Sequence, residues 1–343
     1  MQFRCYTYTL RTKNTFKTAH GSRDQIDTVI VELTDSEGIK GVGEAVPVPY
    51  YGYSAIQVKE ELERHRNIIE NYEVTTPENF WEYLNPYLKH IPFAQCALDI
   101  AVYDYLSQKM LQPLYQYLGL ELHNKMPLSN YTIGIDSIEN MVDKIKSMPF
   151  PIYKIKLGTN QDVEIVKELK RHTNAIFRID ANCAWTAQQT IQYASEFTQL
   201  GVELIEQPLK AEEIENMIEV RKYTKIPMIA DENCIGETDV EKCVNYFDGV
   251  NIKLAKCGGI TPALRMIKKA KASGLKVMMG CMTESSIGIS AVAHLLPLLD
   301  YVDMDGALLI ANDPAEGVYL DYGKAVFSDK WGLGVELMKN DYF

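Results

Sequence analysis

The chain has 343 residues, of which 46% are apolar and 24% are charged, a composition typical of a globular protein with room for one large and one smaller domain. Its formal net charge of −11 argues against nucleic acid as a partner, because phosphate backbones repel acidic surfaces. No run approaches the roughly 20 apolar residues of a membrane helix. The seven cysteines include no Cys-x-x-Cys pair, which favours a cytoplasmic protein with reduced thiols.

The first third of the chain combines strand and helix patterns without a regular repeat. Residues 2–10 and 26–34 alternate as strands do, and a turn at 35–38 leads into a third strand-like run at 39–44. Helical patterns then lie at 54–71, 77–89 and 93–110. We therefore predict an α+β capping domain over residues 1–115.

From about residue 127, strand-like runs alternate regularly with amphipathic stretches. The runs lie at 128–135, 152–157, 176–180, 203–206, 227–230, 249–253, 276–280 and 301–305. Thr186 begins a capping box, and Thr261-Pro262 predicts a cap followed by proline at the first helical position. No Gly-x-Gly-x-x-Gly fingerprint follows the first run, so a barrel is favoured over an open sheet. We predict an α/β protein, a (β/α)7β modified TIM barrel over residues 116–305, with a 306–343 segment that returns to the cap.

Three carboxylates end consecutive predicted strands. Asp180, Glu206 and Asp231 each close an apolar run, and the spacing between them is that of one strand–helix unit. The C-terminal ends of barrel strands meet at one mouth, where the active sites of such barrels lie. Oxygen ligands without histidine or cysteine suit a hard cation. The pattern therefore predicts one Mg²⁺ per subunit.

Lysines are expected on both sides of this metal. Lys154 and Lys156 are two residues apart on one strand and share a face, whereas Lys253 ends a strand on the opposite side of the ring. We expect a second cation and the nearby metal to lower the pKa of a lysine so that its amine can act as a base. One lysine would remove the α-proton of a carboxylate substrate and the other would return a proton to the opposite face. This arrangement predicts racemisation or epimerisation.

These motifs together resemble the enolase superfamily, specifically its muconate lactonising subgroup, which uses a Lys or His base with Mg²⁺. The segments that carry the resemblance are Ala97-Leu-Asp-Ile-Ala101, Lys154-Ile-Lys156, Asp180-Ala-Asn182, Glu206-Gln-Pro208, Asp231-Glu232, Lys253, Lys256-Cys-Gly-Gly259 and Gly332-Leu-Gly334. The resemblance implies that Lys156 and Lys253 form the acid/base pair and that Lys154 is an auxiliary cation.

Two further features point to the substrate. Asp303 and Asp305 place two carboxylates beside the expected site, and two such carboxylates need a cation between them. In the dipeptide epimerases that the chain resembles, an Asp-x-Asp at this place binds the ammonium of a dipeptide. Arg23, in a predicted loop over residues 15–23, resembles the arginine that pairs with the glutamate side chain in Ala-Glu epimerases, although His20 departs from some relatives. Glu284 resembles a family position at the mouth, with its role open.

The leading interpretation is thus a dipeptide epimerase that inverts the second residue, with L-Ala-D/L-Glu from peptidoglycan turnover as its substrate. The alternatives are an N-acylamino acid racemase or an o-succinylbenzoate synthase on the same scaffold, whose substrates have no ammonium for the two aspartates. A barrel that binds a small ligand without turnover is a third alternative. We expect a small-molecule dipeptide as the partner, with no nucleic acid or membrane, and leave homo-oligomerisation open.

Overall fold

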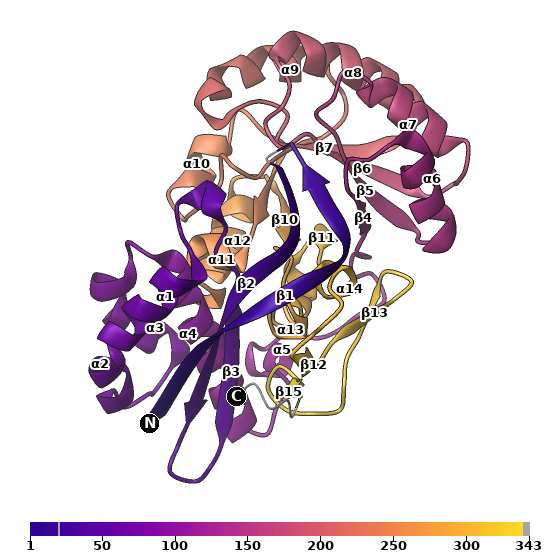
Figure 1. Ribbon diagram of the computed structural model, residues 1–343. Coiled ribbons are helices and arrows are strands. Elements are labelled where there is room, and N and C mark those ends of the chain that lie inside the picture. The colour runs from indigo at the N-terminus through magenta and orange to yellow at the C-terminus, as the bar shows by residue number, and fades with distance from the viewer. Residues whose placement is uncertain (20, 339–343) are drawn as a thin grey trace.

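A computed structural model describes residues 1–19 and 21–338 and shows a barrel beside a smaller sheet-and-helix unit (Figure 1). Eight strands form one parallel sheet in which neighbours in sequence are neighbours in space. A parallel bridge between Ser129 and Val302 links its two outer strands and nearly closes the ring, as predicted. The strands are β4 (Tyr131–Ile133), β5 (Ile152–Lys156), β6 (Ile176–Asp180), β7 (Val202–Glu206), β8 (Met228–Ala230), β9 (Gly249–Ile252), β10 (Lys276–Gly280) and β11 (Tyr301–Asp303).

Helices surround the barrel and bury their apolar faces against it. They are α6 (Ile138–Ser147), α7 (Asp162–Lys170), α8 (Ala187–Gln199), α9 (Met217–Tyr223), α10 (Asp239–Cys243), α12 (Ile260–Ala272) and α13 (Ser286–Ala293), with the shorter α5 (Leu114–Tyr117), α11 (Leu254–Cys257) and α14 (Gly306–Leu309). The predicted capping box at Thr186 is confirmed. The predicted cap at Thr261 is wrong, because α12 already begins at Ile260 and the Thr261 N–H donates to Asp99 Oδ2 at 2.8 Å.

The N-terminal unit is an antiparallel sheet packed on a helix. Its strands are β1 (Gln2–Thr18), β2 (Gly21–Thr34) and β3 (Lys40–Ala45), and its helices are α1 (Ala55–Arg64), α2 (Arg66–Asn71), α3 (Pro77–Leu88) and α4 (Pro92–Lys109). Gly41 and Gly43 let β3 approach α4 so closely that a Cβ at either position would collide with the α4 backbone.

The predicted loop over residues 15–23 is wrong. Phe16, Lys17 and Thr18 pair with Arg23, Ser22 and Gly21, so these six residues belong to the far end of a long antiparallel pair, β1 and β2, that reaches over the barrel (Figure 1). His20 and residues 339–343 lie outside the described part of the chain. The Lys17 carbonyl accepts a hydrogen bond from Ile135 N at 2.9 Å, so this end of the pair docks on the loop after β4.

Buried carboxylates of the N-terminal unit contact the barrel and the C-terminal segment. Asp104 of α4 accepts hydrogen bonds from Val42 N at 2.8 Å and from Leu333 N at 2.7 Å. Glu44 accepts from Gly288 N at 3.0 Å in the first turn of α13. The C-terminal segment holds the short strands β12 (Ala315–Glu316), β13 (Tyr319–Asp321), β14 (Lys324–Val326) and β15 (Glu336–Leu337). The domain division at residues 115 and 305 stays a prediction.

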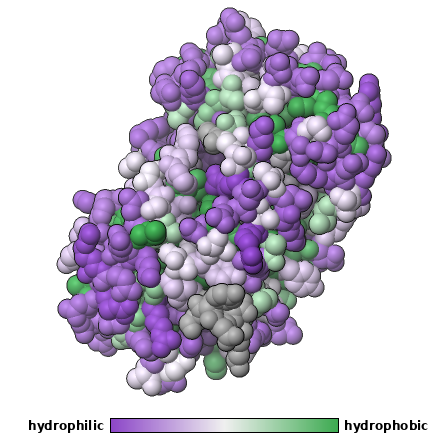
Figure 2. All heavy atoms as spheres, viewed as in Figure 1, coloured by the Kyte–Doolittle hydropathy of each residue, from purple (hydrophilic) through white to green (hydrophobic). Residues whose placement is uncertain are grey.

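Hydrophilic side chains dominate much of the surface in the face that Figure 2 shows, over the barrel helices and over α1 to α3. Among the described helices, none has the length and apolar character to cross a membrane.

His294, just after α13, makes stability depend on pH. Its ring is buried, accepts a hydrogen bond from Tyr115 N and contacts the Leu333 carbonyl, and burial lowers its pKa to about 4. The unfolded chain therefore binds a proton at higher pH than the folded chain does. We expect the free energy of unfolding to fall between pH 6.5 and pH 4, with about 3 kcal/mol coming from this residue. Urea unfolding at several pH values measures this, and His294→Gln should remove the component.

Candidate active site

All of the predicted strand-end charges lie at one end of the barrel. Lys156, Asp180, Glu206 and Asp303 are the last residues of β5, β6, β7 and β11, whereas Asp231 and Lys253 directly follow β8 and β9. Parallel strands in register present their C-terminal residues at the same mouth, so these side chains converge. A pocket of about 110 Å³ opens there, and Lys154, Lys156, Asp231, Lys253, Asp303 and Asp305 line it together with Arg23.

Lys154 lies at the centre of the charged group. Its Nζ is 3.1 Å from Asp180 Oδ2 and 2.8 Å from Glu206 Oε2. The same Nζ donates to Asp303 Oδ2 at 2.7 Å. Lys154 is 1% exposed, so four charged side chains share a site from which water is largely excluded. One ammonium thus bridges two predicted metal ligands and one predicted substrate-binding residue.

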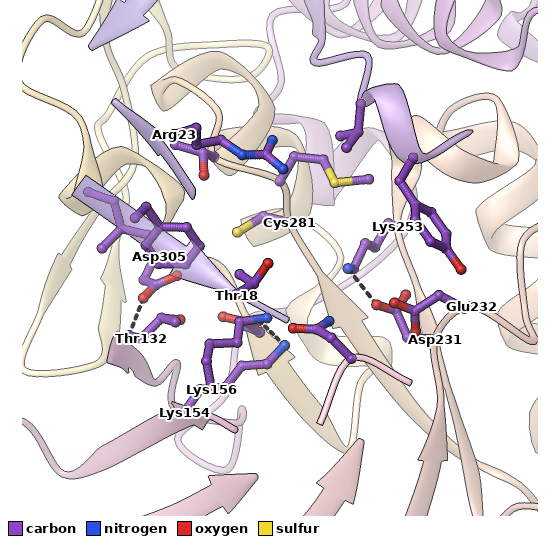
Figure 3. A pocket seen from close by; sticks show the side chains of 18 of the residues that line it. Thr18, Arg23, Thr132, Lys154, Lys156, Asp231, Glu232, Lys253, Cys281 and Asp305 are labelled. Atoms are coloured by element: carbon purple, nitrogen blue, oxygen red, sulfur yellow. Dashed lines mark hydrogen bonds and ion pairs between the residues drawn. The ribbon is translucent and has the colours of Figure 1, made fainter. Parts of the chain in front are cut away.

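Lys156 and Lys253 lie on different sides of the same pocket (Figure 3). Lys156 Nζ donates to Asp180 Oδ2 at 2.6 Å, and Lys253 Nζ donates to Asp231 Oδ2 at 2.8 Å. Burial lowers the pKa of Lys253, but the charges on Asp231 and neighbouring groups outweigh this effect and raise it well above the ordinary value. With these protein groups alone, the ion pair therefore favours the protonated lysine, and the lowering of a lysine pKa by a nearby metal stays a prediction.

The carboxylates differ in their ionisation. Burial opposes the charge on Asp180 and Asp231, but adjacent lysines outweigh burial and hold the pKa of both below the usual range. Burial and the charge on Asp180 raise the pKa of Glu206 to about 7. The site thus holds two firmly anionic carboxylates beside one that needs a further positive charge to stay ionised at neutral pH.

The predicted metal ligands fit a hard divalent cation by their chemistry. Asp180, Glu206 and Asp231 supply buried oxygen atoms from adjacent strands. Within residues 1–19 and 21–338, the buried Asn182 Oδ1 and Asn251 Oδ1 atoms have no hydrogen-bond partner, which leaves two more oxygen donors near these carboxylates. Oxygen donors without nitrogen or sulfur are the ligand set that Mg²⁺ prefers.

Asp303 and Asp305 form a second acidic group beside this set. Ligand atoms of Cys281, Asp303 and Asp305 lie within 4.8 Å of one another. Asp303 Oδ1 accepts from Asn130 Nδ2 at 2.7 Å, and Asp305 Oδ2 accepts from Thr132 N at 2.5 Å. Burial and the charge on Asp303 raise the pKa of Asp305 to about 8. A cation placed between these aspartates would keep both ionised.

Arg23 and Glu284 occupy different surroundings. The half-buried Arg23 lines the pocket from β2, and its guanidinium forms no ion pair with any described carboxylate. Burial lowers its pKa. Glu284 lies in the β10–α13 loop, where burial and the charge on Glu44 raise its pKa well above the usual range. Its Oε1 accepts from Met282 N at 3.2 Å, and its side chain does not line the pocket.

Asn251 and Lys256 belong to the site but were given no role from the sequence. Asn251 Nδ2 donates to Glu206 Oε1 at 2.8 Å, and the buried Lys256 donates to the Asp231 carbonyl at 2.7 Å. Asn251 is two residues before Lys253, so strand alternation could have placed both on one face. For Lys256 no comparable signal exists, because its direction depends on the short helix α11.

The fold and this site define a member of the enolase superfamily. Residues 136–341 match the family model for enolase C-terminal domain-like proteins. Residues 4–119 match the N-terminal domain model of mandelate racemase and muconate lactonizing enzyme. The chain belongs to this superfamily, as the sequence motifs predicted.

Similarity to individual relatives narrows the class of enzyme. An L-Ala-D/L-amino acid epimerase from Flavobacterium johnsoniae is 52% identical over 96% of this chain and 98% of the relative. An L-Ala-D/L-Glu epimerase from Bacteroides thetaiotaomicron is 33% identical over 98% of this chain and 88% of the relative. The crystal structure of a Cytophaga hutchinsonii dipeptide epimerase, complexed with Mg and D-Ala-L-Val, is 27% identical and superposes with a TM-score of 0.93 over 99% of this chain and 96% of that chain. The protein is therefore an isomerase of the racemase and epimerase type.

Replacing Lys154 tests the central ion-pair group. Lys154→Met leaves Asp180, Glu206 and Asp303 without their shared ammonium, and breaking a buried ion pair from one side costs about 3–5 kcal/mol. We expect the free energy of unfolding, measured with urea in metal-free buffer, to fall by that amount. Lys167→Met is the matched control, since its exposed pair with Glu196 contributes less than about 1 kcal/mol. Equal losses in the two variants would contradict the central role of Lys154.

Proposed function

We propose that this protein is a Mg²⁺-dependent dipeptide epimerase that inverts the α-carbon of the second residue. The observation that carries the proposal is the arrangement of one pocket, in which Lys156 and Lys253 lie on different sides and Asp303 and Asp305 lie beside them. The lysines provide two proton carriers, and the aspartates provide a site for one cationic group of the substrate. The relatives support L-Ala as the first residue.

The chain offers separate groups for the two ends of a dipeptide. Asp180, Glu206 and Asp231 would hold Mg²⁺ near the substrate carboxylate. Mg²⁺, when bound there, stabilises the negative charge that develops on that carboxylate as the α-proton leaves. At the other end, Asp303 and Asp305 would bind the ammonium of the first residue by charge-assisted hydrogen bonds.

The two lysines would carry the proton transfers. One Nζ takes the α-proton from one face, and the other Nζ returns a proton to the opposite face, which inverts the carbon. The base has to be neutral at the moment of transfer. Its ion pair with Asp180 or Asp231 must therefore be broken first, since the Nζ that is to accept the proton donates a hydrogen bond to that aspartate. Inversion in both directions requires both amines.

Arg23 would act on the second residue. Its guanidinium lines the pocket without an ion-pair partner among the described carboxylates, which suits a carboxylate or carbonyl on the substrate side chain. L-Ala-D/L-Glu, with a role in peptidoglycan turnover, is therefore the first substrate to test. An N-acylamino acid racemase or an o-succinylbenzoate synthase is less well supported, because neither substrate has an ammonium for Asp303 and Asp305.

Deuterium incorporation at the substrate α-carbon tests the proton-transfer role of the two lysines. Wild-type protein with Mg²⁺ and L-Ala-L-Glu in D₂O should incorporate deuterium at the second α-carbon and form the L,D isomer, as followed by NMR. Lys156→Ala and Lys253→Ala should each lower epimerisation by at least about 100-fold. Each should retain exchange with only one isomer, since one base remains. Epimerisation at the wild-type rate in both variants would disprove the two-base mechanism, and a circular dichroism spectrum checks that each variant folds.

The aspartate pair is tested by substrate binding. Asp305→Asn removes a charge while keeping an oxygen that can accept the Thr132 N–H. We expect KM for L-Ala-L-Glu to rise about tenfold or more, since a charge-assisted contact is worth about 1.5–3 kcal/mol. N-acetylation of the substrate, which removes its ammonium, should raise KM strongly in the wild type and much less in Asp305→Asn. An N-acetylated substrate that the wild type prefers would instead indicate an N-acylamino acid racemase.

A further inference from the structure

A second cavity lies next to the catalytic pocket on the cap side. It has a volume of about 520 Å³, compared with about 110 Å³ for the catalytic pocket. Its walls are Ser22, Arg23, Gln25, Ile26 and Asp27 of β2, together with part of the segment 47–55 that follows β3. Arg23 and Tyr50 line both spaces, so these two side chains form the boundary between them. The catalytic pocket therefore has a neighbour with room for a much longer group.

The wall contributed by β2 has backbone groups available for hydrogen bonding. Pairing between β2 and β3 begins at Val29 opposite Ala45. Before Val29, β2 pairs with β1 on one edge, and no described strand pairs with residues 22–28 on the other edge. Segment 47–55 follows β3 and continues along that unpaired side. An unpaired strand edge binds groups that offer both a donor and an acceptor, and an amide does so.

The side chains at the boundary favour the same chemistry. Arg23 is a donor with no acidic partner in the described chain, so it can donate to a carbonyl that passes from one space to the other. Tyr50 contributes an aromatic ring for an aliphatic stem. Asp27 and Gln25 also line the second cavity, where either can accept a hydrogen bond from an amide N–H and Gln25 can donate to an amide carbonyl; Asp27 Oδ1 already accepts from Thr9 Oγ1 at 2.6 Å. A carbonyl at the boundary followed by an amide beyond it matches this sequence of groups.

We propose that this second cavity receives the side chain of the substrate's second residue when that side chain is long and contains an amide. The chemical class is a dipeptide such as L-Ala-L-Glu whose γ-carboxyl is joined to a further amino acid by an amide bond. Its α-carboxylate and ammonium would remain free for the catalytic pocket. This inference rests on the proposed dipeptide epimerase function and extends it to branched peptides.

The test compares three substrates in the same enzyme. These are L-Ala-L-Ala, L-Ala-L-Glu and L-Ala-L-Glu with glycine on its γ-carboxyl. We expect the extended substrate to be epimerised with a kcat/KM within about tenfold of that of L-Ala-L-Glu. Gln25→Trp should fill the second cavity, because Gln25 lines it and does not line the catalytic pocket. Gln25→Trp should lower kcat/KM for the extended substrate by about tenfold or more and leave kcat/KM for L-Ala-L-Ala unchanged.

Asp24→Trp is the matched control, because Asp24 is an exposed neighbour on β2 that lines neither space. Asp24→Trp should leave kcat/KM for all three substrates nearly unchanged. Turnover of L-Ala-L-Glu without turnover of the extended substrate would overturn the inference, as would an equal loss for all substrates in Gln25→Trp.

A binding measurement separates this inference from the proposed function. Saturation-transfer NMR with wild-type protein should show contact at the glycine protons of the extended substrate, and this contact should weaken in Gln25→Trp. If no substrate is epimerised but the glycine protons contact the protein in this way, the proposed function is wrong and the role of the second cavity in binding the extended side chain is supported. If the glycine protons show no contact while the alanine protons do, the second cavity is overturned.

Discussion

The structure of the active site depends on the burial of one ammonium among three carboxylates. Lys154 contacts Asp180, Glu206 and Asp303 from a position with almost no exposure. Removing such charges from water costs several kcal/mol per ion, and mutual attraction repays this only when the geometry is close. The barrel provides that geometry, because Asp180 and Glu206 are paired in register on the adjacent strands β6 and β7, beside Lys154 on β5, and Asp303 ends β11 at the same mouth. The rest of the site is arranged around this group.

Supporting residues below the mouth hold the same group in place. Asn130 donates to Asp303, and Arg178 donates to the Val302 carbonyl at 2.7 Å and to Glu203. Arg178 is buried in β6, two residues before Asp180, so it occupies the next layer of the barrel interior. The barrel therefore has a polar layer beneath the site, which fixes the direction of Asp303 before any substrate binds.

The cap and the barrel have different tasks that meet at the pocket. The barrel supplies the charged groups for proton transfer and cation binding, and the cap supplies Arg23, Tyr50 and the second cavity beside them. Asp99, Asp104 and Glu44 fix the cap by accepting hydrogen bonds from backbone N–H groups, two of them in the first turns of barrel helices. Substrate choice can thus change through cap residues while the barrel chemistry is kept.

The sequence by itself determined the barrel, because short strand-like runs alternate with amphipathic helical stretches at a regular spacing. It also determined which charged residues meet at the mouth of the barrel, because these residues lie at the ends of strands. It also indicated the superfamily, through motifs that include Lys154-Ile-Lys156 and Asp180-Ala-Asn182. It did not show that residues 16–18 pair with residues 21–23, because that pairing is stabilised by docking on the loop after β4. It also did not show the ion pair of Lys253 with Asp231, which raises the pKa of that lysine and depends on a distance of 2.8 Å between the two side chains. Only the tertiary structure decided these points and placed the second cavity beside Arg23, because distances between residues far apart in the chain depend on how the cap packs against the barrel.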